Sequence, residues 1–311
     1  MPIGLLTPLS ASLGVSVGSV GLMVTAQGLA AGLGVPFIVA WTRRVNRRRL
    51  LTTLLAVLAV GNLITSITSI TSIAANYPLI LGTRLIMGFA SGVFWAIGVS
   101  MAMIPSLPSL PSANAVSVRE VFELPVRNVP LRLVLVMVVF FVLGHFGAYT
   151  FVRPYLEDST SATVGFITVV LIVFGTGGAI GNFIGGQTVN KSLRGSFIVG
   201  GLIMIAALVM LLTIGTYDFG VIAAMILWGL AFGVVQLSQI NMTLSAAPET
   251  FEAAMSLNTM AYNTCIALGA LIGGLFADHV GVTSVVWFGI VLVALAVILR
   301  ASTGRRTTPA I

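Results

Sequence analysis

Two ionisable side chains lie deep within long apolar segments of this chain, where they could take part in moving charge. Arg84 is the only permanently charged residue well inside such a segment. A charge at the centre of a bilayer costs ~2.5–3.5 kcal/mol on insertion scales, so an arginine there faces a bundle interior or water. The alternative is that Arg84 reaches to the membrane surface near Tyr77, about two helical turns away.

His145 lies near the middle of another apolar segment, with Tyr149 and Arg153 following at steps of four on the same helix face. Imidazole titrates near physiological pH, so a histidine facing a cavity at this depth could exchange protons. A neutral histidine, hydrogen-bonded within a helical bundle, is the equal alternative. His145 is therefore a candidate proton-coupling residue.

Amide and aromatic side chains within the apolar segments are the candidates for contact with a small solute. Amides in membrane helices more often bridge neighbouring helices, so this assignment is weak for any one of them. The solute-cavity candidates are Tyr149, Gln239, Asn258 and Asn263. The other amides at mid-segment are Gln27, Asn62, Gln236 and Asn241.

Catalytic and metal-binding patterns are missing from the sequence. We find no nucleophile–base pair, and the glycines lie within helical segments without the strand–loop–helix context of a nucleotide fold. His145 and His279 are too far apart in the chain to indicate a metal site, and Cys265 is the single cysteine. We therefore expect no enzyme, no cofactor and no metal.

The composition places these residues in a membrane. Of the 311 residues, 58% are hydrophobic and 7% are charged, whereas ordinary soluble domains carry about 25% charged residues. Apolar runs of about twenty residues recur, long enough for helices to cross the ~30 Å hydrocarbon core. The net charge of +7 lies in short gaps between these runs, which excludes a nucleic-acid-binding domain. The sequence predicts an all-α polytopic membrane protein in contact with the lipid bilayer.

Hydropathy predicts nine membrane spans. They are Val17–Trp41, Leu50–Ile73, Leu79–Met103, Leu131–Val152, Val164–Val189, Ser196–Gly215, Phe219–Thr243, Ala253–Ala277 and Thr283–Leu299.

The basic run Arg43–Arg49 sets the orientation of these spans. It holds five of the fifteen Lys and Arg residues, and basic loops stay on the cytoplasmic side. The later basic residues then fall on the cytoplasmic side and most acidic residues outside, with Arg153 as the basic exception. We expect a multi-pass protein of the cell inner (plasma) membrane with its C-terminus in the cytoplasm.

A proline- and serine-rich connector divides the spans into two groups. Residues 104–130 contain Pro105, Pro108, Pro111, Pro125 and Pro130, which favours an extended cytoplasmic linker without a packed core. The expected organisation is an N-terminal part of three spans (1–103), the connector (104–130), a C-terminal part of six spans (131–300) and a cytoplasmic tail (301–311).

The two parts share an internal repeat. Gly34-Val35-Pro36 stands ten residues before Arg44, as Gly181-Asn182-Phe183 stands ten before Lys191, at an offset of 147. Gly88–Val93 resembles Gly229–Val234 at an offset of 141, and Pro8 resembles Pro154. Aligning the parts leaves the N-terminal part without a first span and without its last two. Restoring them gives six plus six.

These features resemble the major facilitator superfamily, in particular bacterial proton-coupled drug or sugar efflux permeases. The stretch Gly34 to Arg49 is similar to that superfamily's gating loop between its second and third helices, with Arg44, Arg47 and Arg48 at its basic positions. The second copy offers Lys191 and Arg194. Arg43 and Asn190 stand at the acidic positions of the two copies, so both copies lack the acid of the family's gate.

The segment around Arg84 is similar to the family's fourth-helix motif, whose arginine is implicated in proton transfer, and this resemblance makes Arg84 the second proton-coupling candidate beside His145. The resemblance implies a major-facilitator-type bundle of about nine helices, lacking the first, fifth and sixth. It also implies proton-coupled efflux of a small organic solute, drug-like or sugar-like, by alternating access of two halves. The alternative is a truncated membrane protein that does not transport, a remnant or partner of a complete paralogue.

Overall fold

Nine long apolar helices dominate the computed structural model, which describes residues 6–41, 47–70, 77–102, 118–160 and 162–303. The helices of twenty or more residues in the described part are α2 (Val17–Trp41), α3 (Arg47–Ile70), α4 (Tyr77–Ala102), α6 (Val129–Thr150), α8 (Val164–Thr188), α9 (Leu193–Ile214), α10 (Asp218–Ala246), α11 (Phe251–His279) and α12 (Thr283–Ser302). Each coincides with one of the nine predicted spans, and the boundaries differ by a few residues. The predicted all-α membrane fold is confirmed.

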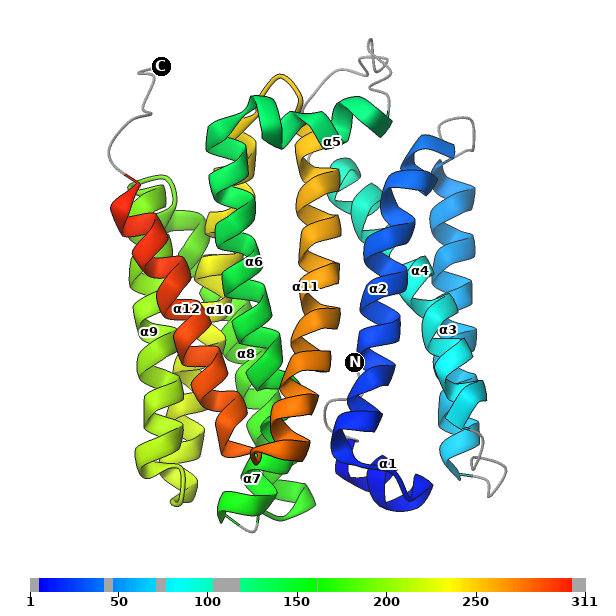
Figure 1. The fold of residues 1–311 in the computed structure, drawn as a ribbon, viewed down its shortest axis with the longest axis vertical. Helices are drawn as coiled ribbons and strands as arrows, with labels where there is room; N and C mark the ends of the chain where they lie inside the picture. Colours follow the sequence, from blue (N-terminus) through cyan, green and yellow to red (C-terminus); the bar gives the residue numbers. More distant parts are fainter. Residues whose placement is uncertain (1–5, 42–46, 71–76, 103–117, 161, 304–311) are drawn as a thin grey trace.

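Three short helices lie at the ends of this bundle. They are α1 (Leu6–Leu13), α5 (Val118–Arg127) and α7 (Val152–Thr160). Figure 1 shows α1 and α7 at one end of the bundle and α5 at the other end.

Polar side chains determine where several long helices begin. Asn128 accepts a hydrogen bond from the backbone N–H of Leu131 (2.9 Å) at the start of α6. Thr163 and Ser192 cap α8 and α9 in the same way, with distances of 3.3 Å and 3.0 Å. These side chains satisfy backbone donors that a helix leaves unpaired in its first turn.

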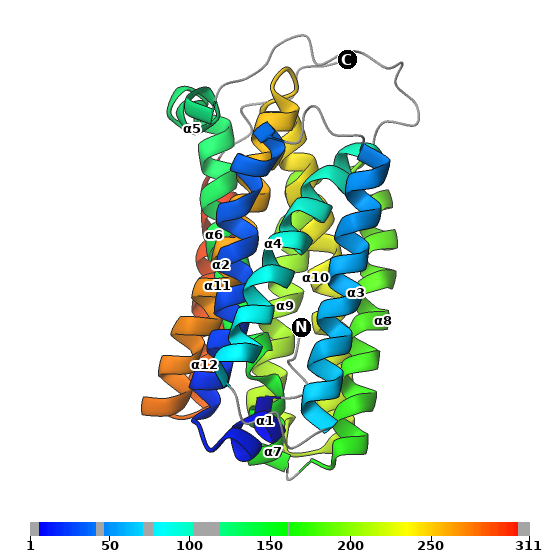
Figure 2. The ribbon, with the colours of Figure 1, turned by 90° about the vertical axis from the view of Figure 1, so that its right-hand side faces the viewer.

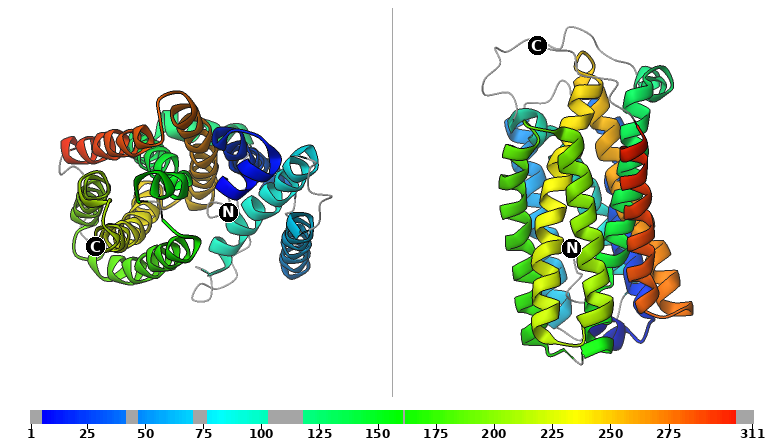
Figure 3. Two further views of the ribbon diagram at one scale, coloured as in Figure 1. Left: turned by 90° about the horizontal axis from the view of Figure 1, so that it is seen from below. Right: turned by 90° about the vertical axis from the view of Figure 1, so that its left-hand side faces the viewer.

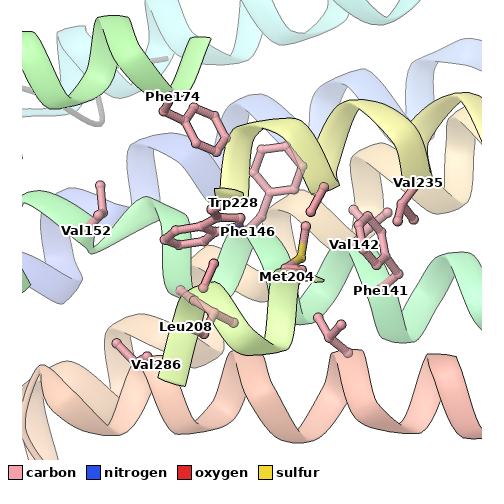
Figure 4. Close-up of a cluster of buried hydrophobic side chains, with 14 of the residues drawn as sticks. Phe141, Val142, Phe146, Val152, Phe174, Met204, Leu208, Trp228, Val235 and Val286 are labelled. Atoms are coloured by element: carbon pink, nitrogen blue, oxygen red, sulfur yellow. The ribbon is translucent and has the colours of Figure 1, made fainter. Parts of the chain in front are cut away.

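The long helices pack in an order that differs from their order in the chain. Contacts run from α3 to α4, α2, α11, α6, α12, α9, α10 and α8 in turn. The six long helices between α6 and α12 enclose a hydrophobic core in which Phe141, Phe146, Phe174 and Trp228 converge (Figure 4). The three N-terminal helices join this core through α2, which lies between α11 and α4 (Figures 1 and 2). Viewed along the bundle, α3 and α8 lie at the two ends of the series (Figure 3).

The internal repeat recurs as a pair of equivalent helix contacts. A Cβ added at Gly88 in α4 would overlap the carbonyl oxygen of Gln27 in α2, and one at Gly229 in α10 would overlap that of Phe174 in α8. Gln27 and Phe174 are 147 positions apart, and the two glycines are 141 apart, as the sequence alignment requires. The contact between α2 and α4 is thus repeated by α8 and α10.

A second glycine in each pair repeats the same contact one turn later. Gly92 lies against the carbonyl of Ala31, and Gly233 lies against that of Gly178. The offsets are again 147 and 141. Close approach of small residues is the usual means by which membrane helices pack when no hydrophobic force distinguishes helix from lipid.

The connector differs from the expected extended linker. Residues 103–117 lie outside the described part, but Val118–Arg127 forms α5 even though Pro125 lies inside it. Val121 and Leu124 of α5 pack with Leu131 and with Ala254 and Leu257 of α11. Proline density suggested a linker, but an amphipathic run of Val, Phe and Leu next to an apolar face was sufficient to form a helix.

Candidate functional site

His145 lies at the centre of a cluster of aromatic rings contributed by α6, α8 and α10. Its side chain is 1% exposed. The imidazole stacks on Phe232 with ring centroids 4.2 Å apart, and Tyr149 stacks on Phe174 at 4.3 Å. Trp228 meets the imidazole edge-on at 5.7 Å. The cluster therefore joins three helices of the C-terminal six around one titratable group.

A hydrogen bond fixes the protonation pattern of His145. Trp228 Nε1 donates to His145 Nδ1 over 3.0 Å within the buried core. An indole nitrogen can only donate, so Nδ1 carries a lone pair and the proton of the neutral imidazole is on Nε2. A second proton would have to bind at Nδ1, where the indole N–H now points. Binding of that proton therefore requires the indole and the imidazole to separate.

Arg84 is buried in α4. It is 6% exposed, so its side chain is covered by the protein. Its Nε has no hydrogen-bond partner, and it forms no ion pair with any residue of the described part. It lies one turn before Gly88, whose helix-packing partner Gln27 also has a buried side-chain oxygen without a partner. The α2–α4 pair thus contains a donor and an acceptor that the described protein leaves unused.

A carboxylate joins the two groups of helices at the end of the bundle that holds α1 and α7. Asp278, near the end of α11, accepts from the Ser16 hydroxyl (2.7 Å) and from the backbone N–H of Gly18 (3.1 Å). Gly274 of α11 lies directly against Gly18. A carboxylate at a helix N-terminus satisfies unpaired N–H groups and the helix dipole. Asp278 therefore holds the start of α2 against the end of α11.

The four predicted solute-cavity residues are placed in different surroundings. Tyr149 belongs to the aromatic cluster around His145. Gln239 is 1% exposed and its side-chain oxygen has no partner among the described residues. Asn258 accepts from Thr243 Oγ1 (3.4 Å), which links α11 to α10. The Thr243 hydroxyl also lies 3.0 Å from the backbone carbonyl of Gln239, one turn earlier in α10, so its single proton is shared between these two acceptors.

Three further amides make hydrogen bonds within their own helices. Asn62, Asn241 and Asn263 each donate to the carbonyl four residues earlier in their own helix, all at 2.9 Å. An amide near its own helix backbone can satisfy itself locally, and this requires no partner helix.

The predicted gating-loop residues are only partly described. Arg44 lies outside the described part, as do the surroundings of Gly34 and the side chains of Arg47 and Arg48. In the second copy, Lys191 is exposed in the turn between α8 and α9. Arg194 donates from a guanidinium nitrogen to the backbone carbonyl of Ala301 at the end of α12, where cations favour the helix dipole.

Sequence reasoning missed the partners of His145. Trp228, Phe174 and Phe232 are ordinary apolar residues in a chain that is 58% hydrophobic, so nothing distinguished them locally. The internal repeat draws attention to two of these three residues. Phe174 aligns with Gln27, and Trp228 stands directly before Gly229, the first residue of the repeated segment Gly229–Val234. The pairing of Asp278 with α2 spans 260 residues of sequence, so no local pattern indicates it.

Comparisons with known proteins agree with this architecture. The family profile described as Major Facilitator Superfamily matches residues 1–104 and 134–310. The crystal structure of the nucleoside transporter NupG (D323A mutant) is similar over 96% of this chain and 93% of that one, with a TM-score of 0.70 and 12% identity. The crystal structure of the human organic anion transporter MFSD10 (TETRAN) is similar over 96% and 89%, with a TM-score of 0.64 and 13% identity.

The family match covers most of the chain and includes both groups of long helices. The two structural likenesses, at such low identity, concern the fold alone. Family members are membrane transporters and not in general enzymes, which agrees with the absence of a catalytic pattern from the sequence. This multi-pass membrane protein belongs to the major facilitator superfamily.

Proposed function

We propose that this protein exports a small organic solute in exchange for protons by alternating access. Membership of a transporter superfamily supports the general activity. The arrangement of α2 against α11 supports it further, because one contact surface joins the two groups of helices and could act as the axis of a rocking motion. We place the protein in the cell inner membrane with its C-terminus in the cytoplasm, following the basic run Arg43–Arg49.

The hydrogen bond between Trp228 and His145 is the observation that carries proton coupling. His145 is the proton carrier in this proposal, since its Nδ1 can bind a proton only when Trp228 moves away. Proton binding would therefore shift α10 relative to α6. A proton that changes helix packing is what coupling requires, because a ligand shifts an equilibrium only by its different affinity for the two states.

Arg84 has a different role in this mechanism. An arginine keeps its charge in proteins, so it cannot itself carry the proton. Its guanidinium instead supplies a fixed positive charge in α4. We propose that this charge attracts an electron-rich group of the solute and disfavours a protonated His145 while that group is absent. Tyr149 and Gln239 are the further solute contacts that we favour.

Reconstituted vesicles provide the test. The purified chain would be inserted into vesicles containing a pH-sensitive dye, and nucleosides, sugars, organic anions and cationic dyes would be added in turn. We expect at least one solute to drive proton movement. His145→Asn should abolish this proton movement but retain solute binding, because the binding residues remain.

Two matched variants make the test specific. His279→Asn changes the other histidine, which is exposed at the end of α11, and should leave the proton movement unchanged. Arg84→Lys keeps the charge and should retain more activity than Arg84→Gln, which removes it. A parent protein that moves protons with no solute in the panel, or full proton movement by His145→Asn, would contradict the proposal.

A further inference from the structure

The corner between α5 and α6 presents apolar side chains on the outside of the bundle. Phe122 and Val126 of α5 are exposed by 47% and 72%, and they lie four residues apart on one helix face. Val129, the first residue of α6, is exposed by 48%. We call these three residues the corner edge. Figure 2 shows α5 almost end-on at the margin of the bundle, above α6, so the corner edge lies where the membrane-crossing helix α6 begins.

Packing on both sides holds this corner in place. Val121 and Leu124, on the other side of the apolar face of α5, pack against buried residues of α11. Asn128 caps α6 with its side-chain oxygen, and its Nδ2 donates to the backbone carbonyl of Ala246 at the end of α10 (2.8 Å). The inner side of α5 is therefore already covered, and the exposed side chains of the corner edge have no place to turn inward.

The polar face of α5 carries charges that partly balance each other. Arg127 is bound to Glu123 over 2.6 Å, with its side chain 76% exposed, and Glu120 is exposed on the same face. A helix with a charged face and an apolar face that includes an aromatic residue is the form that lies in the interface of a membrane. The orientation of α5 fits that form, because its apolar edge adjoins the start of a membrane-crossing helix.

Arg132 lies on the outward face of α6. Val129, Val136 and Val139 are exposed by 48%, 38% and 36%, and together with Arg132 they follow one another at steps of three and four along one face. Arg132 is exposed, and it stands about 4.5 Å along the helix axis from Val129. No hydrogen bond or ion pair joins its side chain to another described residue. A charge among valines on the outside of a membrane helix is costly unless the side chain reaches a counter-charge near the headgroups.

A phospholipid supplies both contacts that the corner lacks. The planar guanidinium of an arginine binds a phosphate group through two parallel hydrogen bonds. The acyl chains of the same molecule would lie against the valines of α6. A free phosphate ion would satisfy the arginine alone. A headgroup with a net negative charge is favoured over a zwitterionic one, whose ammonium group opposes the arginine.

From this juxtaposition we propose that the corner of α5 and α6 binds one anionic phospholipid of the adjoining leaflet. Arg132 holds its phosphate, Val136 lies against its acyl chains, and Phe122 and Val126 enter the membrane beside its headgroup. In the orientation proposed above, this leaflet is the cytoplasmic one.

A thiol one turn beyond Arg132 can report on the bound lipid. The full chain carries Val136→Cys, labelled with a fluorophore, and its buried Cys265 is replaced by Ser. Quenching by brominated phosphatidylglycerol and by brominated phosphatidylcholine with the same acyl chains gives the relative affinity of the two lipids at this position. We expect a preference of about tenfold for phosphatidylglycerol. Arg132→Gln should lower the preference to about twofold, whereas the matched variant Arg127→Gln should retain it, because Arg127 is already paired with Glu123.

Inorganic phosphate distinguishes a lipid site from a general anion site. Compared with sodium chloride of the same ionic strength, it should leave the quenching by phosphatidylglycerol unchanged. Displacement of the lipid by inorganic phosphate would overturn the proposal. The absence of any preference in the parent, or equal losses of preference in Arg132→Gln and Arg127→Gln, would also overturn it.

Two further labelled positions test the placement of α5 without any change at Arg132. Val126→Cys belongs to the corner edge and Glu120→Cys to the polar face of the same helix. We expect brominated acyl chains to quench the label at position 126 and aqueous iodide to quench the label at position 120. Equal quenching of both labels by iodide would show that the corner edge faces water, and this result would overturn the proposal.

Discussion

Replacing Gly88 by alanine should show how much the close packing of α2 on α4 depends on the lack of a side chain at position 88. The added Cβ would overlap the carbonyl oxygen of Gln27 and lie 2.8 Å from its carbonyl carbon and Cα. These atoms belong to a helix backbone, which cannot move aside as a flexible side chain can. The two helices must separate, and overpacking of this kind costs about 1–3 kcal/mol.

Gly82 in the same helix provides the control, because a Cβ there would meet nothing within 4 Å. Both substitutions gain the ~0.8–1.0 kcal/mol by which alanine favours a helix interior over glycine. Subtracting the change in the free energy of unfolding for Gly82→Ala from that for Gly88→Ala removes this shared gain. The difference that is left is the packing cost at position 88. Gly88→Ala should therefore unfold more readily than Gly82→Ala by about 1–3 kcal/mol.

The assay is reversible unfolding in mixed micelles, followed by the fluorescence of the four tryptophans. The repeat supplies an independent second measurement. Gly229→Ala should show a similar deficit relative to Gly175→Ala, because Gly229 lies against the Phe174 carbonyl and Gly175 lies against nothing. Equal stability of Gly88→Ala and Gly82→Ala would refute the inferred packing. A loss of stability in Gly88→Ala without a similar loss in Gly229→Ala would also refute it.

Three further predictions concern single polar contacts. Trp228→Phe leaves the buried Nδ1 of His145 without its donor and should lower the free energy of unfolding by about 1–3 kcal/mol, measured in the same assay. An unchanged free energy of unfolding would show that this hydrogen bond does not contribute to stability. Asp278→Ala removes one of the side-chain acceptors at the start of α2, where Ser16 also accepts from the Ser19 N–H, and should cost about 0.5–2 kcal/mol. Asp278→Asn keeps an accepting oxygen and should cost less, so equal losses would contradict a capping role. Burial raises the pKa of Tyr155, which keeps its hydroxyl protonated as the donor to the Leu211 carbonyl (2.7 Å). Tyr155→Phe should therefore cost about 0.5–1.5 kcal/mol, and a variant as stable as the parent would exclude this contribution.

The long helices could be predicted because each carries its own evidence. A run of about twenty apolar residues is sufficient to indicate a span, and α2 begins and ends at the predicted residues Val17 and Trp41. The repeat was also accessible, since Gly88 and Gly229 keep the same local sequence pattern. The absence of three helices from a six-plus-six arrangement stays a prediction, as do the orientation and the role of the gating loop.

Contacts between distant segments could not be predicted in the same way. The α5 helix depends on an apolar face of α11 that is formed by residues more than a hundred positions later, and its prolines indicated an extended chain. The aromatic cluster around His145 depends on how three helices rotate about their axes. Rotation leaves little trace in helices that are apolar on all sides, because both core and lipid accept the same side chains.

The isolated charge of Arg84 has an electrical consequence. Since no described carboxylate pairs with it, any displacement of α4 along the membrane normal carries nearly a full positive charge through the transmembrane field. One charge crossing the whole field corresponds to ~2.3 kcal/mol per 100 mV, so a fifth of that path corresponds to ~0.5 kcal/mol. A difference of that size changes a rate or an equilibrium about twofold. The membrane potential would then act directly on the position of the N-terminal helices, in addition to any effect on the transported solute.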